Sequence, residues 1–246
     1  MTATGENTDD QAAAARPAAV LWDMDGTIVD TEPLWMRAET ALVQSYGGTW
    51  THEQALQLVG SGPYNSAAIL IAAGVQLAPI EVIRHLTDEV MVQLREQGLP
   101  WRPGALELLT TLRDAGIPSA LVTMSFRSMA ELVAEAIAVE LGVETAFQVV
   151  VAGDDVTHAK PHPEAYLRAA TLLDVPVERC VAIEDSISGT ASAVASGAAA
   201  VAVPFLVEIA ESPAHDRWET LSGRGIDDLA EVLRHHDLRL ATGGAR

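Results

Sequence analysis

Residues 20–27 read Val20-Leu21-Trp22-Asp23-Met24-Asp25-Gly26-Thr27, an apolar run that ends in two carboxylates, a glycine and a threonine. Such a run predicts a buried strand that delivers its acids to the rim of a sheet. Because side chains alternate between the faces of a strand, we expect Asp23 and Asp25 to project to the same side. Two close anions repel each other unless a cation or a proton lies between them. The stretch therefore predicts a phosphoryl-transfer centre, and the rest of the chain must supply its cation, its positive clamp and its lid.

The composition limits the classes of protein to which the chain can belong. Its 246 residues allow one domain with a large insertion or two small domains, and 49% apolar residues are ample for a packed core. The 34 acidic residues against 15 basic ones argue against nucleic acid or an anionic membrane as a partner. Cys180 is the only cysteine, so no intrachain disulfide can form and a reducing compartment is expected. No stretch is long enough to span a membrane, and we predict a cytoplasmic protein with a disordered tail at residues 1–17.

The segment from residue 34 to residue 102 has a helical pattern throughout. Pro33 can begin one helix that closes near Gly47-Gly48, and Thr51 can cap a second. Further helices are predicted at about 64–73 and 79–97. So long a helical stretch between one strand and the next is more than a simple crossover needs. We therefore predict an inserted α-helical cap domain over 34–102.

After Gly104 the pattern changes to apolar strands that alternate with helices. Strands are expected at 119–123, 147–151, 180–185 and 199–203, and helices at 104–115, 126–140, 163–173, 188–196 and 227–236. Continuous apolar strands between helices predict a parallel sheet covered by helices on both faces. The expected fold class is α/β and Rossmann-like, with a core of residues 18–33 and 103–237 and a frayed C-terminus at 238–246.

Polar residues collect at the carboxyl ends of the expected strands, where open parallel sheets bind their ligands. Besides Asp23 and Asp25, these residues include Thr123, Glu184 and Asp185. Mg2+ prefers hard oxygen ligands, and Asp23 with Asp185, helped by the backbone carbonyl of Asp25, fits such a site. Two local alternatives stay open: Asp185 could cap the following helix, and the Thr123 hydroxyl could satisfy nearby backbone groups instead of a phosphoryl oxygen.

Lys160 is the only lysine of the chain and lies in His158-Ala159-Lys160-Pro161-His162-Pro163. A lone lysine is ordinarily a solvated surface charge. Here two prolines fix the loop, and an ammonium aimed at several carboxylates suits a phosphate clamp. His158 and His162 have a spacing that could place a zinc pair on a helix, but the prolines make a helix there implausible. We therefore interpret both histidines as loop residues.

The motifs occur in the order and approximate spacing of the haloacid dehalogenase (HAD) superfamily, which the chain resembles over residues 18–236. They are Asp23-Met24-Asp25-Gly26-Thr27, Thr123, Lys160-Pro161 and Glu184-Asp185-Ser186. The helical insertion resembles the C1-type cap of that superfamily. Asp30-Thr31-Glu32-Pro33-Leu34-Trp35 is similar to its beta-phosphoglucomutase-like and sugar-phosphatase branch.

The resemblance implies a role for each motif. Asp23 would be the nucleophile that forms an aspartyl-phosphate, and Asp25 the general acid and base. Thr123 and Lys160 would hold the phosphoryl oxygens. Asp185 would hold Mg2+ with Asp23 and the Asp25 carbonyl. Glu184 would either bind the Mg2+ itself or contact a group that does. The cap would close over the substrate on hinges near 31–35 and 99–103.

Departures from the branch favour hydrolysis over mutase chemistry. Trp35 stands where the mutase branch carries a cap histidine, and residues 59–63 lack the lysine and arginine found around its cap glycine. We therefore predict a Mg2+-dependent phosphatase that acts on a small phosphorylated metabolite, by default a sugar phosphate. A beta-phosphoglucomutase-like mutase is the alternative enzyme, and a phospho-receiver or binding module is the alternative outside catalysis. No pattern assigns an oligomeric state. The residues expected to face the substrate from the cap are Trp35, Glu39, Ser61, Tyr64 and Asn65.

Overall fold

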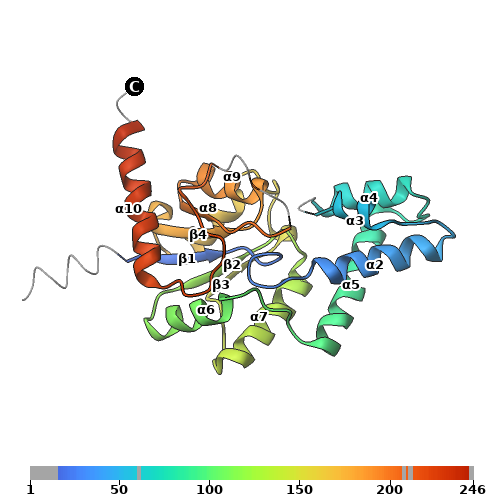
Figure 1. The fold of residues 1–246 in the computed structure, drawn as a ribbon, viewed down its shortest axis with the longest axis horizontal. Coiled ribbons are helices and arrows are strands. Elements are labelled where there is room, and N and C mark those ends of the chain that lie inside the picture. The colour runs from blue at the N-terminus through green and yellow to red at the C-terminus, as the bar shows by residue number, and fades with distance from the viewer. Residues whose placement is uncertain (1–15, 60–61, 207–208, 210–212, 244–246) are drawn as a thin grey trace, which may run out of the picture.

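The computed structural model describes residues 16–59, 62–206, 209 and 213–243. Figure 1 shows two parts: a sheet with helices above and below it, and a group of helices that lies beyond one end of the strands. Most of the expected tail at 1–17 lies outside the described residues. Among the described residues, no helix is both long enough and apolar enough to cross a membrane.

The sheet has six parallel strands in the order β3-β2-β1-β4-β5-β6, so the chain starts in the centre and builds outward in both directions. The strands are β1 (Ala19–Trp22), β2 (Ser119–Val122), β3 (Val149–Val151), β4 (Cys180–Glu184), β5 (Ala199–Ala202) and β6 (Asp216–Arg217). The strands β1 and β4 are neighbours, with Trp22 opposite Ile183. This register sets Asp23 beside the end of β4, where Glu184 and Asp185 follow.

Alternation along each strand divides the core of the sheet into two layers. On β1, Val20 and Trp22 belong to one apolar cluster, whereas Ala19 and Leu21 belong to the other. The helices that cover the first face are α6 (Ala105–Asp114), α7 (Arg127–Leu141) and α10 (Ile226–Gly243). The second face is covered by α8 (Glu164–Leu172) and α9 (Ile187–Ser196). The continuous apolar strands of the sequence therefore form a parallel sheet that is buried on both faces, as predicted.

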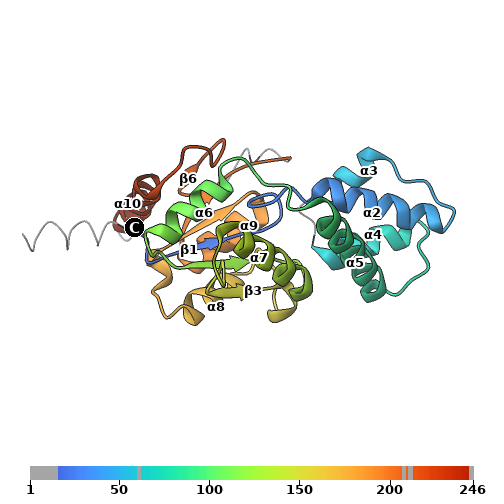
Figure 2. The same cartoon turned by 90° about the horizontal axis from the view of Figure 1, so that it is seen from below.

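The cap consists of four described helices that pack on one another (Figures 1 and 2). They are α2 (Glu32–Ser45), α3 (His52–Leu56), α4 (Pro63–Ala72) and α5 (Pro79–Gln97). The predicted start at Thr51 is confirmed, because its side chain accepts a hydrogen bond from the Gln54 backbone while the Gln54 side chain accepts one from the Thr51 backbone. The longest helix, α5, buries an apolar stripe at helical spacing that includes Val82, Leu86 and Val90.

Two chain segments join the cap to the sheet, and they pair with each other. The backbone N–H of Asp30 donates to the carbonyl of Pro100 at 2.7 Å, and that of Arg102 donates to Ile28 at 2.8 Å. The Arg102 side chain also donates to the carbonyl of Gly26 at 3.0 Å. These bonds place the expected hinge at 99–103 directly against the loop that carries the acidic motif.

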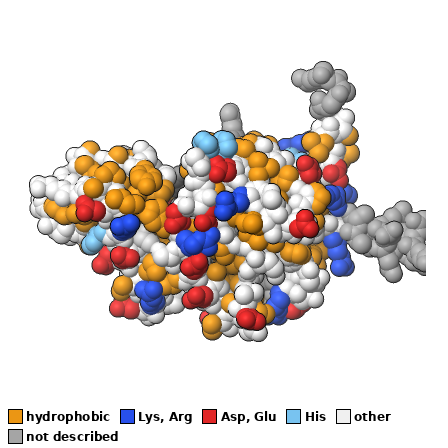
Figure 3. All heavy atoms as spheres, turned by 180° about the vertical axis from the view of Figure 1, so that it is seen from behind, with side chains coloured by type: hydrophobic (Ala, Val, Ile, Leu, Met, Phe, Trp, Pro, Cys, Tyr) orange, Lys and Arg blue, Asp and Glu red, His pale blue; other side chains and the backbone are white. Residues whose placement is uncertain are grey.

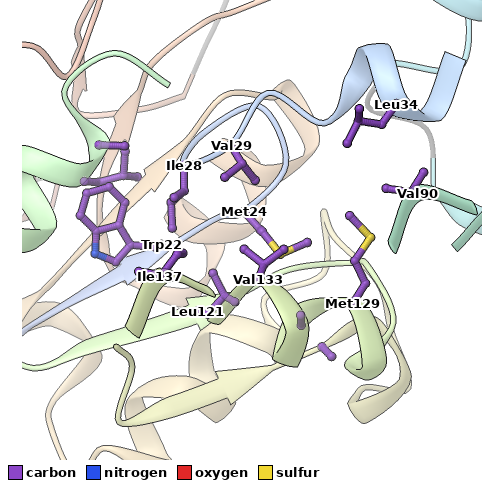
Figure 4. Close-up of a cluster of buried hydrophobic side chains, with 14 of the residues drawn as sticks. Trp22, Met24, Ile28, Val29, Leu34, Val90, Leu121, Met129, Val133 and Ile137 are labelled. Carbon is purple, nitrogen blue, oxygen red and sulfur yellow. The ribbon is translucent and has the colours of Figure 1, made fainter. Parts of the chain in front are cut away.

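Apolar packing continues from the sheet into the cap (Figure 4). Leu34 of α2 and Val90 of α5 belong to the same buried cluster as Met129 of α7 and Met24, which lies between the two aspartates. Met24 is fully buried, so it packs in the core and does not face the substrate. The acidic motif therefore lies at the junction of cap and core.

The ends of several elements differ from the sequence prediction. The last helix was expected at 227–236 with a frayed end from 238, but α10 continues to Gly243. That prediction was wrong because Leu238 and Leu240 stand two positions apart and are exposed, so the apolar period of a helix ends near His236 although the helix itself continues. The short edge strand β6 was also missed, because two polar residues give no alternating pattern.

On the described part of the face drawn in Figure 3, arginine and lysine side chains lie among acidic ones and form no continuous basic patch. A surface that binds nucleic acid would need such a patch or stripe. This face therefore carries charges of both signs, on a chain whose net charge is −19.

Candidate active site

Lys160 and Asp23 form a buried ion pair at the ends of the central strands. The Lys160 Nζ atom lies 2.7 Å from Oδ1 of Asp23 and 2.6 Å from Oε1 of Glu184, and it donates to the carbonyl of Val122 at 2.8 Å. The Lys160 side chain is only 4% exposed. Burial opposes its charge, but Asp23 and Glu184 outweigh burial and raise the pKa of Lys160. The single lysine of the chain is therefore a fixed cation inside the site.

Glu184 lies behind this pair and is fully buried. Besides the bond from Lys160, it accepts a hydrogen bond from the Tyr166 hydroxyl at 2.5 Å and one from Ser186 at 3.3 Å. Burial raises the pKa of Glu184, whereas Lys160 opposes the shift. A Cβ atom at Gly189 would lie 1.8 Å from the Glu184 carboxylate, so only glycine fits there. Glu184 therefore holds Lys160 in position from the buried side of the site.

Asp185 faces the same point from the next position in the chain. A Cβ atom at Gly26, whose φ is +81°, would lie 2.0 Å from Oδ2 of Asp185, so this glycine lets the carboxylate approach the acidic loop. Carboxylate oxygens of Asp23, Glu184 and Asp185 lie within 4.8 Å of one another. Burial, Asp23 and Glu184 raise the pKa of Asp185 well above its usual range.

This donor set fits a divalent cation. When all three carboxylates are ionised, they exceed the one ammonium of Lys160 by two negative charges. Mg2+ would neutralise both, and it prefers carboxylate oxygens and retained waters. Asp23 and Asp185 face the cavity, whereas Glu184 is engaged by Lys160 and Tyr166. The geometry therefore favours Asp23 and Asp185 as direct ligands and Glu184 as a group that acts through its neighbours.

Asp25 is held by two hydroxyl groups. Thr31 donates to its Oδ1 at 2.5 Å and Ser125 donates to its Oδ2 at 2.7 Å. Burial is the largest influence on the pKa of Asp25 and raises it, with a further contribution from Asp23, while the two hydroxyls oppose the shift. A carboxyl group with a raised pKa is suited to donate and recover a proton. The Thr123 hydroxyl, 3.4 Å from Oδ2 of Asp25, accepts a bond from the Ser125 backbone at 3.0 Å.

A cavity of about 180 Å3 lies between the core and the cap. The residues of the predicted site that line it are Asp23, Asp25, Thr123, Lys160 and Asp185. Asp23 and Lys160, which are 137 positions apart in the chain, thus meet here, and Glu184 contacts Lys160 without lining the cavity.

The cap contributes some of the expected substrate-facing residues and not others. Trp35 and Glu39 line the cavity. Tyr64 is 61% exposed, and neither it nor Asn65 lines the cavity, so the prediction was wrong for both. They lie on α4 one and two residues beyond Pro63, which does line it, and the turn of the helix directs them to solvent. Ser61 lies outside the described residues.

Sequence reasoning missed several residues of the site. Ser125 follows Thr123 by two positions, so the same strand-end argument applied to the next polar residue would have found it. Thr31 belongs to the stretch Asp30-Thr31-Glu32-Pro33-Leu34-Trp35, but nothing in its sequence neighbourhood distinguishes it from an ordinary turn residue. Tyr166 lies on the apolar face of α8 and is indistinguishable by pattern from a core aromatic. Glu32 begins α2 and lines the cavity, where burial, Asp25 and Glu39 raise its pKa to about 8.

The loop interpretation of His158 and His162 is correct, yet the two rings still meet. Their centroids are 4.4 Å apart, and Nδ1 of His158 lies 2.8 Å from Oε2 of Glu164. That carboxylate also accepts backbone bonds from Thr157 and His158 at 2.8 and 2.9 Å. Both histidine side chains are at least half exposed. Glu164 therefore fastens the start of the loop that carries Lys160.

A capped Rossmann-like sheet with a buried aspartate–lysine pair at its strand ends defines a hydrolase of the haloacid dehalogenase type. A family model for haloacid dehalogenase-like hydrolases matches residues 17–197. The chain belongs to this family and is a hydrolase.

Two relatives and one solved structure are similar to the chain over most of its length and support the same branch. The chain is 32% identical over 223 residues to protein CbbY of Cereibacter sphaeroides, covering 87% of this chain and 93% of that one. It is 32% identical over 180 residues to the phosphorylated carbohydrates phosphatase of Thermotoga maritima, covering 73% of this chain and 81% of that one. The crystal structure of a mutant of CbbY from Rhodobacter sphaeroides in complex with xylulose-(1,5)bisphosphate aligns with a TM-score of 0.77 at 28% identity, covering 87% of this chain and 99% of that one.

Proposed function

We propose that the protein is a Mg2+-dependent phosphatase that hydrolyses a small phosphomonoester through an aspartyl-phosphate on Asp23. The observation that carries the proposal is the 2.7 Å contact between Lys160 Nζ and the Asp23 carboxylate, with Asp25 in the same cavity. The phosphatase among the relatives supports the reaction class. We keep the cap boundaries of 34–102 and a cytoplasmic location as parts of this proposal.

The first half-reaction transfers the phosphoryl group to the protein. An Asp23 oxygen attacks phosphorus in line with the bond to the leaving oxygen, that bond breaks, and protonated Asp25 gives its proton to the leaving oxygen. Lys160 and Thr123 hold the phosphoryl oxygens and stabilise the charge that builds on them. A bound Mg2+, held by Asp23 and Asp185, would supply further charge neutralisation between the two anions.

The second half-reaction restores the protein. Asp25, now ionised, takes a proton from a water molecule as that water attacks phosphorus. The bond between Asp23 and phosphorus breaks, and inorganic phosphate leaves. The hydroxyls of Thr31 and Ser125 keep the Asp25 carboxyl aimed at the same point through both steps.

A panel of phosphomonoesters, assayed with Mg2+ and again with EDTA, tests the proposal. We expect release of inorganic phosphate that EDTA abolishes and that Asp23→Asn abolishes. Asp114→Asn is the matched control, since that aspartate side chain is 64% exposed on the surface. If neither EDTA nor Asp23→Asn stops hydrolysis, the proposal is wrong.

The mutase and the phospho-receiver, the two alternative functions, would give different results from a phosphatase in simple assays. A mutase would depend on a sugar bisphosphate primer and would convert one sugar phosphate into another. A phospho-receiver incubated with acetyl phosphate would accumulate stable phosphoprotein instead of turning over. The cap side of the cavity argues against the mutase, because Lys160 is the only lysine, arginine or histidine among the described residues that line it.

A further inference from the structure

Three side chains that can bind a metal ion meet on the surface of the core, outside the cavity. They are His158 and His162, in the loop before α8, and Glu164, the first residue of α8. One donor atom of each lies within 4.8 Å of one donor atom of each of the others. The two rings meet across a loop and not along a helix, with centroids 4.4 Å apart. The proposed reaction uses none of these three side chains, and none of them lines the cavity.

The distances between the donor atoms are close to those of a zinc site. Nδ1 of His158 lies 2.8 Å from Oε2 of Glu164, and Nδ1 of His162 lies 4.0 Å from the same oxygen. Zn2+ bonds of about 2.0–2.2 Å at tetrahedral angles set neighbouring ligand atoms roughly 3.3 Å apart. The two imidazole side chains are 60% and 50% exposed, so small rotations of the rings can bring both distances to that value.

The backbone that carries the two rings is held in place. The His158 N–H donates to Oε2 of Glu164 at 2.9 Å, and the Thr157 N–H donates to its Oε1 at 2.8 Å. The hydroxyl of Ser192, on α9, donates to the His162 carbonyl at 2.7 Å. Because these bonds already order the loop, an ion that binds there would cost little further conformational entropy.

The donor set favours a transition metal over Mg2+. Imidazole nitrogens suit Zn2+, Ni2+ and Cu2+, whereas Mg2+ prefers oxygen ligands. Glu164 accepts several hydrogen bonds through its carboxylate, which keeps it ionised and able to bind a cation. Two histidines and one glutamate are a known set of zinc ligands that leaves a fourth position for water.

We propose that His158, His162 and Glu164 form a site for Zn2+ or a similar transition-metal ion, separate from the acidic site in the cavity. Lys160 lies between the two histidines in the chain, but its side chain is buried against Asp23. A bound ion would join the start of α8 to the loop that carries Lys160 and would stabilise the folded protein. This inference does not depend on the proposed phosphatase function.

Equilibrium dialysis of the whole chain against Zn2+ in excess Mg2+, followed by metal analysis, tests the site. Zn2+ also binds carboxylates, so variants are needed to identify the ion that the histidines hold. We expect the wild type to hold one more Zn2+ than the double variant His158→Asn/His162→Asn. Each single variant should weaken the binding of that ion by about ten-fold or more, since even the loss of a supporting group costs about 10–100-fold. His85→Asn, an exposed histidine of α5, is the control and should keep the wild-type number and affinity.

Thermal unfolding gives a second measurement that does not depend on counting ions. Zn2+ added in excess Mg2+ should raise the Tm of the wild type and of His85→Asn more than that of the double variant. The replaced side chains of the double variant are both at least half exposed, so we expect it to fold. The proposal is overturned if the wild type and the double variant bind the same number of Zn2+ ions with the same affinity, or if Zn2+ shifts their Tm equally.

Discussion

Replacing Lys160 with methionine tests the central ion pair most directly. The substitution keeps the length of the side chain but removes three contacts of Nζ, with Asp23, Glu184 and the Val122 carbonyl. It leaves two buried carboxylates facing each other without the cation between them. Removing one partner of a buried ion pair costs about 3–5 kcal/mol, because the remaining charge stays buried.

Two separable effects follow from this geometry. The free energy of unfolding of Lys160→Met should fall by about 3–5 kcal/mol in EDTA. In the double variant Lys160→Met/Glu184→Gln the excess acid is gone, so we expect about half or more of that loss to be recovered. Activity should not be recovered: both variants should lose about 10²–10³ in kcat with Mg2+, because the phosphoryl oxygens have lost their fixed cation.

Urea titration followed by fluorescence measures the stability, and phosphate release with Mg2+ measures the activity. Arg84→Met, an exposed cation of α5, serves as the control and should change neither. The reasoning is refuted if Lys160→Met is as stable as the wild type in EDTA, or if the double variant is less stable than the single one.

Three further changes have definite expected outcomes. Asp25→Asn should lower kcat by about 10²–10⁴, measured by steady-state phosphate release, because the amide cannot exchange a proton with the leaving group; an unchanged kcat would remove Asp25 from the acid–base role. Gly189→Ala should lower the free energy of unfolding by about 1–3 kcal/mol in urea, since the new Cβ would lie 1.8 Å from the Glu184 carboxylate, and unaltered stability would contradict that close approach. Burial, then His236, lowers the pKa of His215 from 6.5 to about 4. Because the unfolded state gains this proton first, stability should fall as the pH drops from about 6.5 toward 4, and His215→Gln should show a shallower fall of Tm between pH 7 and 5; equal slopes for both proteins would disprove the coupling.

Local pattern was enough to predict most of the fold. The apolar run before Asp23 and the later strand at 180–185 carry their signal within a few residues, because a strand buried on both faces must be apolar throughout. The capping motif at Thr51 is equally local, and the structure confirms it. The edge strand β6 and the end of α10 were predicted badly because their positions depend on pairing and backbone continuity, not on hydrophobic period.

The site was predictable where its residues end a strand and was missed where they do not. Asp25 and Asp185 follow strands, and the rule for open parallel sheets applies to them directly. Ser125 obeys the same rule but was passed over in favour of Thr123. Tyr166 reaches Glu184 from the middle of a helix, and only the packing of α8 on the sheet brings its hydroxyl there.

The sequence by itself determined that two acids follow a buried strand, that the one lysine of the chain stands directly before a Pro-His-Pro stretch, and that a helical cap lies between the first and second strands. These features follow from side-chain period and turn chemistry, which act over short distances along the chain. Only the tertiary structure decided that Lys160 bridges Asp23 and Glu184, which requires the strand order around β1. It also decided that Glu39 is buried in the cap wall, because burial depends on which helices pack together.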